Sequence, residues 1–173
     1  AGQIVRAAGA DPDRFFSLLQ YLLFYGSTLV IGLALMVFII YPTIASLIIK
    51  KISYKQFVKG MQEAQITAFS TSSSVATLPV TMETIRKKLG VSKRVTSFVL
   101  PIGATVNMDG TSMYQAIAVV SMAQLHMIDL TLGQQVVIIV TATLASIGAA
   151  AIPSAGLVLM IIVLESVGLN PGW

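Results

Sequence analysis

The sequence contains no cysteine, which excludes disulfide bridges, cysteine-ligated zinc and thiol catalysis. Charged residues are also scarce: Lys, Arg, Asp and Glu make up 10% of the 173 residues, against about 25% in a typical soluble domain. The single histidine, His126, can build neither a metal site nor a Ser-His-Asp triad on its own. These absences exclude a soluble enzyme, and we expect no catalytic residues.

Apolar residues account for 55% of the chain, and the mean hydropathy is +0.85. This composition is typical of membrane proteins, so we expect a lipid bilayer around the chain. The net charge of +4 does not indicate nucleic-acid binding, because the basic residues lie in short clusters without interleaved aromatic residues. The chain starts at Ala1 without a signal-peptide pattern and ends just after an apolar run, so we expect it to belong to a longer protein.

Residues 1–53 form the first segment, which contains 35 consecutive uncharged residues from Phe15 to Ile49. A straight helix needs roughly 20 residues to cross the hydrocarbon core of a bilayer. The segment therefore predicts an extracellular lead-in followed by a long, tilted transmembrane helix, with a bend near Pro42.

Residues 54–90 contain two apolar arms that are each too short to span a bilayer, separated by a serine-rich stretch from Ser70 to Ser74. Basic residues flank both arms, and the positive-inside rule places both ends in the cytoplasm. We therefore expect this segment to enter the membrane and return as a re-entrant hairpin. The basic residues are Lys50, Lys51, Lys55, Lys59, Arg86, Lys87, Lys88, Lys93 and Arg94.

Residues 91–128 have the pattern of a transmembrane helix that is broken between Asn107 and Thr111. The C-terminal end of this helix lacks Lys and Arg, so the positive-inside rule places it outside the cell. Residues 129–173 predict a second re-entrant hairpin. This segment contains a long uncharged run. Small residues, glycines and a proline between Ser146 and Gly156 break its helical pattern and favour two half-helices joined at a tip. A single kinked span is the alternative.

An internal repeat supports the second hairpin, because Ser72-x-x-x-Ala76-x-Leu78-Pro79 matches Ser146-x-x-x-Ala150-x-Ile152-Pro153 at an offset of 74 residues. Each repeat holds one span and one hairpin, so the second copy is inverted relative to the first. We therefore expect an all-α membrane protein built as an inverted repeat of a transmembrane helix plus a re-entrant helical hairpin. Secondary transporters have this architecture, with the binding site between the broken helices.

Asp109 is the only carboxylate deep inside an apolar stretch, and no Lys or Arg lies in the same span. A bare carboxylate at the centre of a bilayer costs at least about 2.5 kcal/mol, so it needs a proton, a partner or a cation. Asn107, Asp109 and Thr111 offer oxygen ligands, and the break frees backbone carbonyls between Gly103 and Met108. This set favours a hard cation such as sodium. A partner on another helix outside this chain is the alternative.

The serine run is compatible with a solvated linker or with the tip of a hairpin. Because it lies between apolar arms, we favour a tip whose hydroxyl groups and helix-terminal N–H groups bind an anion such as a carboxylate. The second tip, from Ser146 to Gly156, is poor in reactive side chains, and its small residues suit a mobile gate.

Three motifs together closely resemble the glutamate transporter family, which includes the excitatory amino acid transporters and the prokaryotic dicarboxylate/amino acid:cation symporters. They are SSSVATLP at Ser72–Pro79, LPIGATVNMDGT at Leu100–Thr111 and ASIGAAAIP at Ala145–Pro153. The resemblance implies a transport domain that moves like an elevator in the cell membrane against a homotrimeric scaffold. It also implies a multi-pass protein that carries acidic amino acids into the cell together with sodium, which is the coupling ion.

Residue by residue, the resemblance assigns sodium ligands and substrate contacts to this sequence. The sodium ligands are Gly103, Thr105, Asn107, Met108, Asp109, Ser146, Ile147 and Ala149. The substrate contacts are Ser72, Ser73, Ser74, Thr111 and backbone groups between Ile152 and Gly156.

Gln115 follows Tyr114 at a position where the proton-coupled members of the family carry glutamate, so the resemblance does not extend to proton coupling there. The scaffold helices of the family and its last helix, which selects the substrate, have no counterpart in this sequence. A proton-coupled symporter of dicarboxylates or of neutral amino acids therefore stays an alternative. Two functions of other classes also stay alternatives, an ion-conducting channel and a purely structural membrane anchor.

Overall fold

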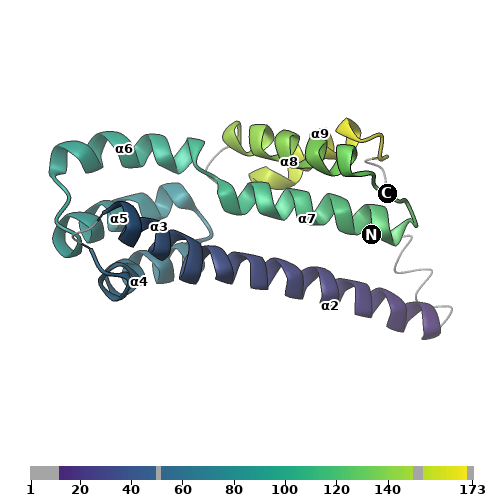
Figure 1. Ribbon diagram of the computed structural model, residues 1–173, viewed down its shortest axis with the longest axis horizontal. Helices are drawn as coiled ribbons and strands as arrows, with labels where there is room; N and C mark the ends of the chain where they lie inside the picture. Colours follow the sequence, from purple (N-terminus) through teal and green to yellow (C-terminus); the bar gives the residue numbers. More distant parts are fainter. Residues whose placement is uncertain (1–11, 50–51, 150–153, 171–173) are drawn as a thin grey trace.

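The computed structural model describes residues 12–49, 52–149 and 154–170, and every regular element in these ranges is helical (Figure 1). The predicted all-α fold class is thus confirmed. The helices are α2 (Pro12–Leu35), η1 (Met36–Ile40), α3 (Tyr41–Ile48), α4 (Tyr54–Thr71), α5 (Ser74–Lys88), α6 (Lys93–Val106), α7 (Asp109–Leu125), α8 (Leu132–Ile147) and α9 (Ala155–Ser166).

One continuous helical rod made of α2, η1 and α3 runs along most of the molecule's length (Figure 1). From Phe15 to Ile48 it has 34 residues and a mean hydropathy of 2.4 in its most apolar window, where no residue is buried inside the protein. In the described part of the chain, this helix alone has the length and composition to cross a membrane by itself. Its exposed apolar side chains suit contact with lipid.

The rod changes its winding just before Pro42, where Met36–Ile40 forms a π-helical turn. Proline has no N–H group, so Pro42 cannot donate to the carbonyl four residues earlier, at Phe38. The hydroxyl group of Tyr54, on the next helix, donates to that carbonyl instead. The rod thus has a π-helical turn just before Pro42, and the contact of Tyr54 with Phe38 joins it to the start of α4. The predicted bend near Pro42 stays a prediction.

Two helical pairs follow the rod, α4 with α5 and α8 with α9, and the members of each pair pack against each other. Ser72 connects the first pair in a left-handed conformation, with φ of 49°. The pair is tightly packed at Gly60, where a Cβ atom would lie 2.8 Å from Cδ2 of Leu89. A glycine at this position lets the two arms of the hairpin approach closely.

Polar residues fix where the helices of these pairs begin. Ser53 and Thr131 each form a capping box, in which the side chain accepts from the backbone N–H three residues later and the glutamine there accepts in return. The same pairing of a hydroxyl residue with a following glutamine thus starts both hairpins. The positions of the hairpins in the membrane stay predictions, as do the four segments 1–53, 54–90, 91–128 and 129–173.

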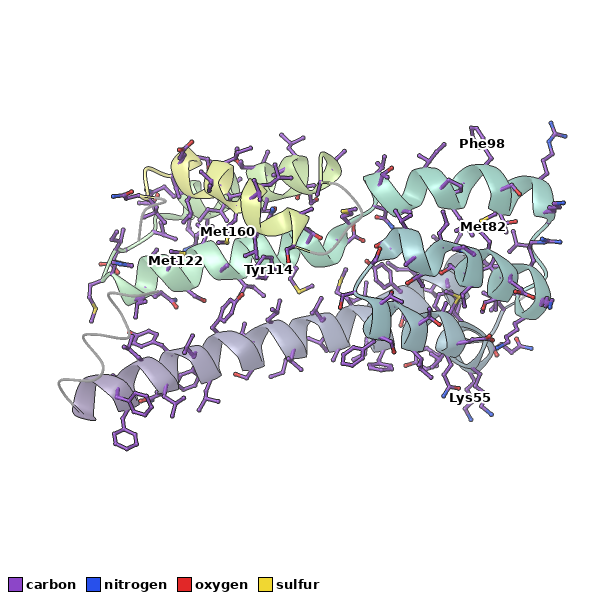
Figure 2. All side chains as sticks on the ribbon, turned by 180° about the vertical axis from the view of Figure 1, so that it is seen from behind. Lys55, Met82, Phe98, Tyr114, Met122 and Met160 are labelled. Carbon is purple, nitrogen blue, oxygen red and sulfur yellow. The ribbon has the colours of Figure 1, made fainter. Side chains whose placement is uncertain are left out.

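The buried core lies at one end of the molecule, between α7, α8 and α9. It consists of Val119, Ala123, Ile138, Ala142, Val163, Leu164 and Leu169. Met122 and Met160, labelled in Figure 2, pack against it from α7 and α9. The rod packs against α7, and at Gly32 a Cβ atom would lie 2.7 Å from the sulfur atom of Met113. The core and this close approach hold α7 in place.

The contact between Tyr54 and Phe38 gives a prediction for stability. We expect Tyr54→Phe to lower the free energy of unfolding by about 0.5–1.5 kcal/mol, because it removes the hydrogen bond to the carbonyl of Phe38. Adding Pro42→Ala restores a backbone N–H four residues after Phe38, so the double variant should recover most of the loss. Thermal unfolding of the detergent-solubilised protein measures both effects. A double variant less stable than Tyr54→Phe alone would contradict this explanation.

Candidate functional site

The site is built around the break between two consecutive helices. The first, α6, ends at Val106, and the second, α7, begins at Asp109. The backbone of Asn107 (φ −100°, ψ 79°) and of Met108 (φ −114°, ψ 55°) leaves the helical region for these two residues only. The break therefore exposes carbonyl groups at the end of α6 and N–H groups at the start of α7. Such groups need partners at membrane depth, which makes the break a candidate binding site.

Residues on either side of the break alternate between two cavities. The first, which we call the acidic cavity, has a volume of about 520 Å³, and its polar lining residues are Asn107, Asp109, Ser112, Thr143 and Ser146. The second, which we call the tip cavity, has a volume of about 690 Å³ and is lined by residues that include Ser72, Ser74, Met108, Gly110, Thr111, Ser154 and Gly156. The tip cavity thus brings both hairpins to the break.

Two donors hold the carboxylate of Asp109 in the acidic cavity. The hydroxyl group of Tyr41, from the rod, donates to Oδ2. With its amide nitrogen turned toward the carboxylate, Asn107 donates to Oδ1 at 2.9 Å. The contact with Tyr41 joins residues 68 positions apart, and no pattern in the sequence indicated it. Tyr41 stands at the point where the π-turn returns to α-helix.

Hydroxyl groups from α7 and α8 form the rest of the polar wall of the acidic cavity. Ser112 Oγ lies 3.3 Å from Thr143 Oγ1, and Thr143 donates to the carbonyl of Ile139 at 2.7 Å. Ser146 donates to the carbonyl of Thr143 at 2.8 Å and is almost completely buried. Ser112 and Thr143 are not among the ligands predicted from the sequence, although Thr143 is a polar residue within an apolar helix.

The tip cavity contains hydroxyl groups and the starts of three helices. Ser74 opens α5, Gly110 and Thr111 lie in the first turn of α7, and Ser154 directly precedes α9. Helix N-termini present unpaired N–H groups and a partial positive charge, so three of them around one cavity favour an anion. Ser73 does not line the cavity, because its side chain accepts from the backbone N–H of Ala76 and caps α5.

Gln115 connects α7 to the second hairpin one turn beyond Thr111. Its side chain is fully buried, and Nε2 donates to the carbonyl of Gly156 at 2.9 Å. Its Oε1 atom has no hydrogen-bond partner among the described residues. In the resemblance stated above, Gln115 stands where the proton-coupled members of the family carry glutamate. Gly156 also lies close to Thr111, since a Cβ atom on Gly156 would be 2.7 Å from Cγ2 of Thr111.

The structure divides the predicted ligands among three places. The acidic cavity holds Asn107, Asp109, Ser146 and Ile147, and the tip cavity holds Ser72, Ser74, Met108, Thr111, Ala149 and Gly156. Gly103 and Thr105 lie on α6 and line neither cavity; the hydroxyl group of Thr105 donates to the carbonyl of Ile102 at 3.0 Å. Ile152 lies outside the described residues. The roles of all these residues stay predictions.

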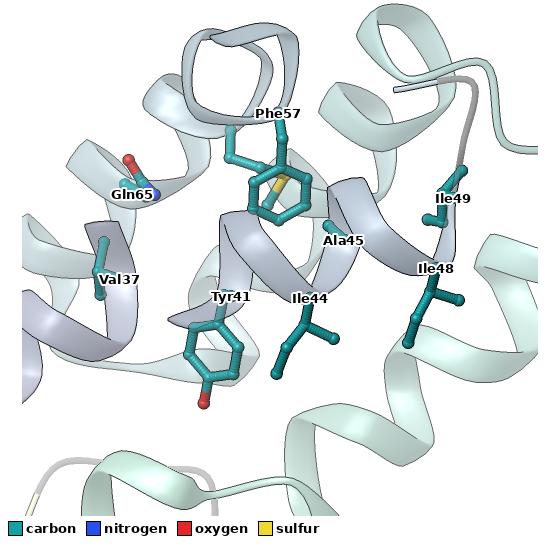
Figure 3. Close-up of a pocket in the computed structure, with 9 residues that line it drawn as sticks. Val37, Tyr41, Ile44, Ala45, Ile48, Ile49, Phe57 and Gln65 are labelled. Atoms are coloured by element: carbon teal, nitrogen blue, oxygen red, sulfur yellow. The ribbon is translucent and has the colours of Figure 1, made fainter. Parts of the chain in front are cut away.

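A third cavity, of about 460 Å³, lies between the rod and α4 and is almost entirely apolar (Figure 3). Phe57 and Gln65 face it from α4, while the hydroxyl group of Tyr41 points away from both (Figure 3). Among the described residues, no three His, Asp or Glu side chains gather to hold a metal ion. Of these three cavities, the two at the break are the ones with several polar side chains.

Comparisons with known proteins match this chain over nearly its whole length. A model of the sodium:dicarboxylate symporter family matches residues 4–172. Excitatory amino acid transporter 3 of Bos taurus is 50% identical over 169 residues, which cover 98% of this chain and 31% of that protein.

Two other relatives give the same result. An excitatory amino acid transporter of Caenorhabditis elegans is 51% identical over 160 residues, covering 92% of this chain and 30% of that protein. Excitatory amino acid transporter 1 of Rattus norvegicus is 50% identical over 145 residues, covering 84% and 26%. The chain thus spans less than a third of the length of these relatives.

The close approach of Gly156 to Thr111 predicts that a substitution at Gly156 destabilises the protein and that a second substitution, at Thr111, compensates for it. We expect Gly156→Ala to destabilise the protein by about 1–3 kcal/mol, because the new Cβ overlaps the methyl group of Thr111. Thr111→Ser removes that methyl group and keeps the hydroxyl group, so the double variant should be nearly as stable as Thr111→Ser alone. Thermal unfolding in detergent measures all three. Additive losses in the double variant would show that the two residues are not in contact.

Proposed function

Because this chain belongs to the sodium:dicarboxylate symporter family, as its resemblance to the glutamate transporters indicated, we propose that it is part of a sodium-coupled symporter of acidic amino acids. In this proposal it forms part of the transport domain of a multi-pass protein of the cell membrane. The whole protein moves its substrate by elevator-type alternating access, assembles as a homotrimer and has no enzyme activity.

The observation that carries the proposal is the opposite chemistry of the two cavities at one break. The acidic cavity contains a carboxylate, and no Lys or Arg is among the described residues that line it, so it suits a cation. The tip cavity contains hydroxyl groups and three helix N-termini, so it suits the carboxylate groups of an acidic substrate. A sodium-coupled symporter of an anionic substrate needs one site for the cation and one site for the anion.

The arrangement also supplies a route for coupling. Asn107 and Asp109 line the acidic cavity, while Met108 and Gly110 between and beside them line the tip cavity. A cation that fixes the first two residues also fixes the backbone that faces the substrate. Sodium should therefore raise the affinity for substrate, and substrate should raise the affinity for sodium by the same factor.

The second hairpin is the proposed gate of the tip cavity. Its residues Ser154 and Gly156 line the cavity, and Gln115 holds Gly156 to α7 by one hydrogen bond. Ser154 has a left-handed backbone, with φ of 66°, which is an unfavourable conformation for a residue with a Cβ atom. In the described part of the tip, the strained backbone of Ser154 and the attachment of Gly156 through a side-chain hydrogen bond suit a segment that opens and closes.

Uptake of radiolabelled L-aspartate by the full-length protein in proteoliposomes tests the proposal. One set of vesicles has an inward sodium gradient, and the other has an equal inward proton gradient in sodium-free buffer. We expect saturable uptake only with sodium. Uptake with protons alone would support the proton-coupled alternative, and flux that neither saturates with aspartate nor depends on it would support a channel.

A substitution of Asp109 tests the proposed cation site in this assay. We expect Asp109→Asn to raise the sodium concentration for half-maximal uptake at least about tenfold, because it removes the negative charge from the acidic cavity without changing its shape. Asp129→Asn is the matched control, since Asp129 is exposed between α7 and α8. Equal sodium dependence in both variants would remove Asp109 from the ion site.

A further inference from the structure

The direction of the hydrogen bonds in the acidic cavity can be worked out from the carbonyl group of Ile139. A carbonyl oxygen accepts and cannot donate, so Thr143 must use its single hydroxyl proton in the 2.7 Å bond to Ile139. Thr143 Oγ1 can then only accept from Ser112, whose Oγ lies 3.3 Å away. The proton of Ser112 therefore points toward α8 and is not available to the cavity.

The same reasoning applies to the other polar groups of this wall. Ser146 donates its proton to the carbonyl of Thr143 at 2.8 Å. Asp109 is an acceptor, and its two oxygens already receive bonds from Tyr41 and from the amide of Asn107. All three hydroxyl protons of the wall are thus directed to acceptors in the protein, and these hydroxyl groups offer only oxygen lone pairs to whatever enters the cavity.

The placement of these oxygens follows from helical spacing. Asp109 and Ser112 are three residues apart on α7, and Thr143 and Ser146 are three residues apart on α8. Residues with this spacing lie on one face of a helix, so each helix turns one pair toward the shared cavity. A carboxylate together with hydroxyl oxygens whose protons are used within the protein is a ligand set for a hard cation and repels an anion.

We propose that Ser112 Oγ is a direct ligand of the cation held by Asp109, and that Thr143 is a positioning residue that keeps the lone pairs of Ser112 in the cavity by accepting its proton. This inference rests on the proposed sodium coupling and adds two residues to the site. The ligand is a hard monovalent cation of the size of sodium.

Two measurements on the full-length protein test the assignment. The first is the sodium concentration that gives half-maximal L-aspartate uptake in proteoliposomes. The second is the rise in melting temperature when sodium chloride replaces choline chloride in the absence of amino acid, because a ligand that binds only the folded protein stabilises it. The second readout does not depend on transport.

The variants are chosen to separate the ligand from its support. Ser112→Ala removes the oxygen, and Thr143→Val keeps the shape of the side chain but removes the acceptor. Thr143→Ser is the conservative rescue, since it retains a hydroxyl group. The matched controls are Ser27→Ala and Thr67→Val, whose hydroxyl groups donate to backbone carbonyls in α2 and α4 away from the break.

We expect Ser112→Ala to raise the half-maximal sodium concentration about tenfold and Thr143→Val about threefold, with maximal uptake little changed. The double variant should resemble Ser112→Ala, because both changes act on one contact. Thr143→Ser and both controls should behave as the wild type. The sodium-dependent rise in melting temperature should shrink in the same order.

Wild-type sodium dependence in both Ser112→Ala and Thr143→Val would overturn this inference and leave the proposed symport intact. If Ser112→Ala fails to fold, an unaltered sodium response in Thr143→Val overturns it equally. A wild type that is stabilised by sodium in a manner sensitive to Ser112, yet takes up no aspartate, would support the cation site and contradict the proposed substrate. A wild type that responds to sodium in neither measurement would overturn both proposals.

Discussion

The whole arrangement depends on a two-residue break in a helix within an apolar segment. At membrane depth no water is available to bond the backbone groups that a break exposes, so irregular backbone persists only against protein or a polar cavity. Here the core between α7, α8 and α9 and the close contact of Gly32 with Met113 hold α7, while α6 continues on the other side of the break (Figure 1). These contacts fix the break in place.

Because the break is so short, neighbouring residues face different surroundings. Asn107 and Asp109 line the acidic cavity, and Met108 and Gly110 line the tip cavity. A segment of four residues, 107–110, can therefore face a cation in one cavity and an anion in the other, with the two ligands kept apart. In the proposed symporter, this geometry links the ion and the substrate through a short piece of backbone, without a long chain of intermediate contacts.

The sequence was sufficient to predict the features that depend on local patterns. The helical fold class and the family follow from apolar runs and contiguous motifs. The contacts of Tyr41 with Asp109 and of Ser112 with Thr143 could not be predicted, because they join residues 68 and 31 positions apart and depend on how the rod and α8 pack against α7. The roles of the predicted ligands stay predictions.

The most direct test of the account is a high-resolution structure of the full-length protein with sodium and L-aspartate bound. The account predicts a cation in contact with Asp109 in the acidic cavity and a carboxylate of the substrate beside Ser74 and Thr111 in the tip cavity. A substrate carboxylate in the acidic cavity, or a cation among the hydroxyl groups of the tip cavity with Asp109 bound only to protein, would contradict it.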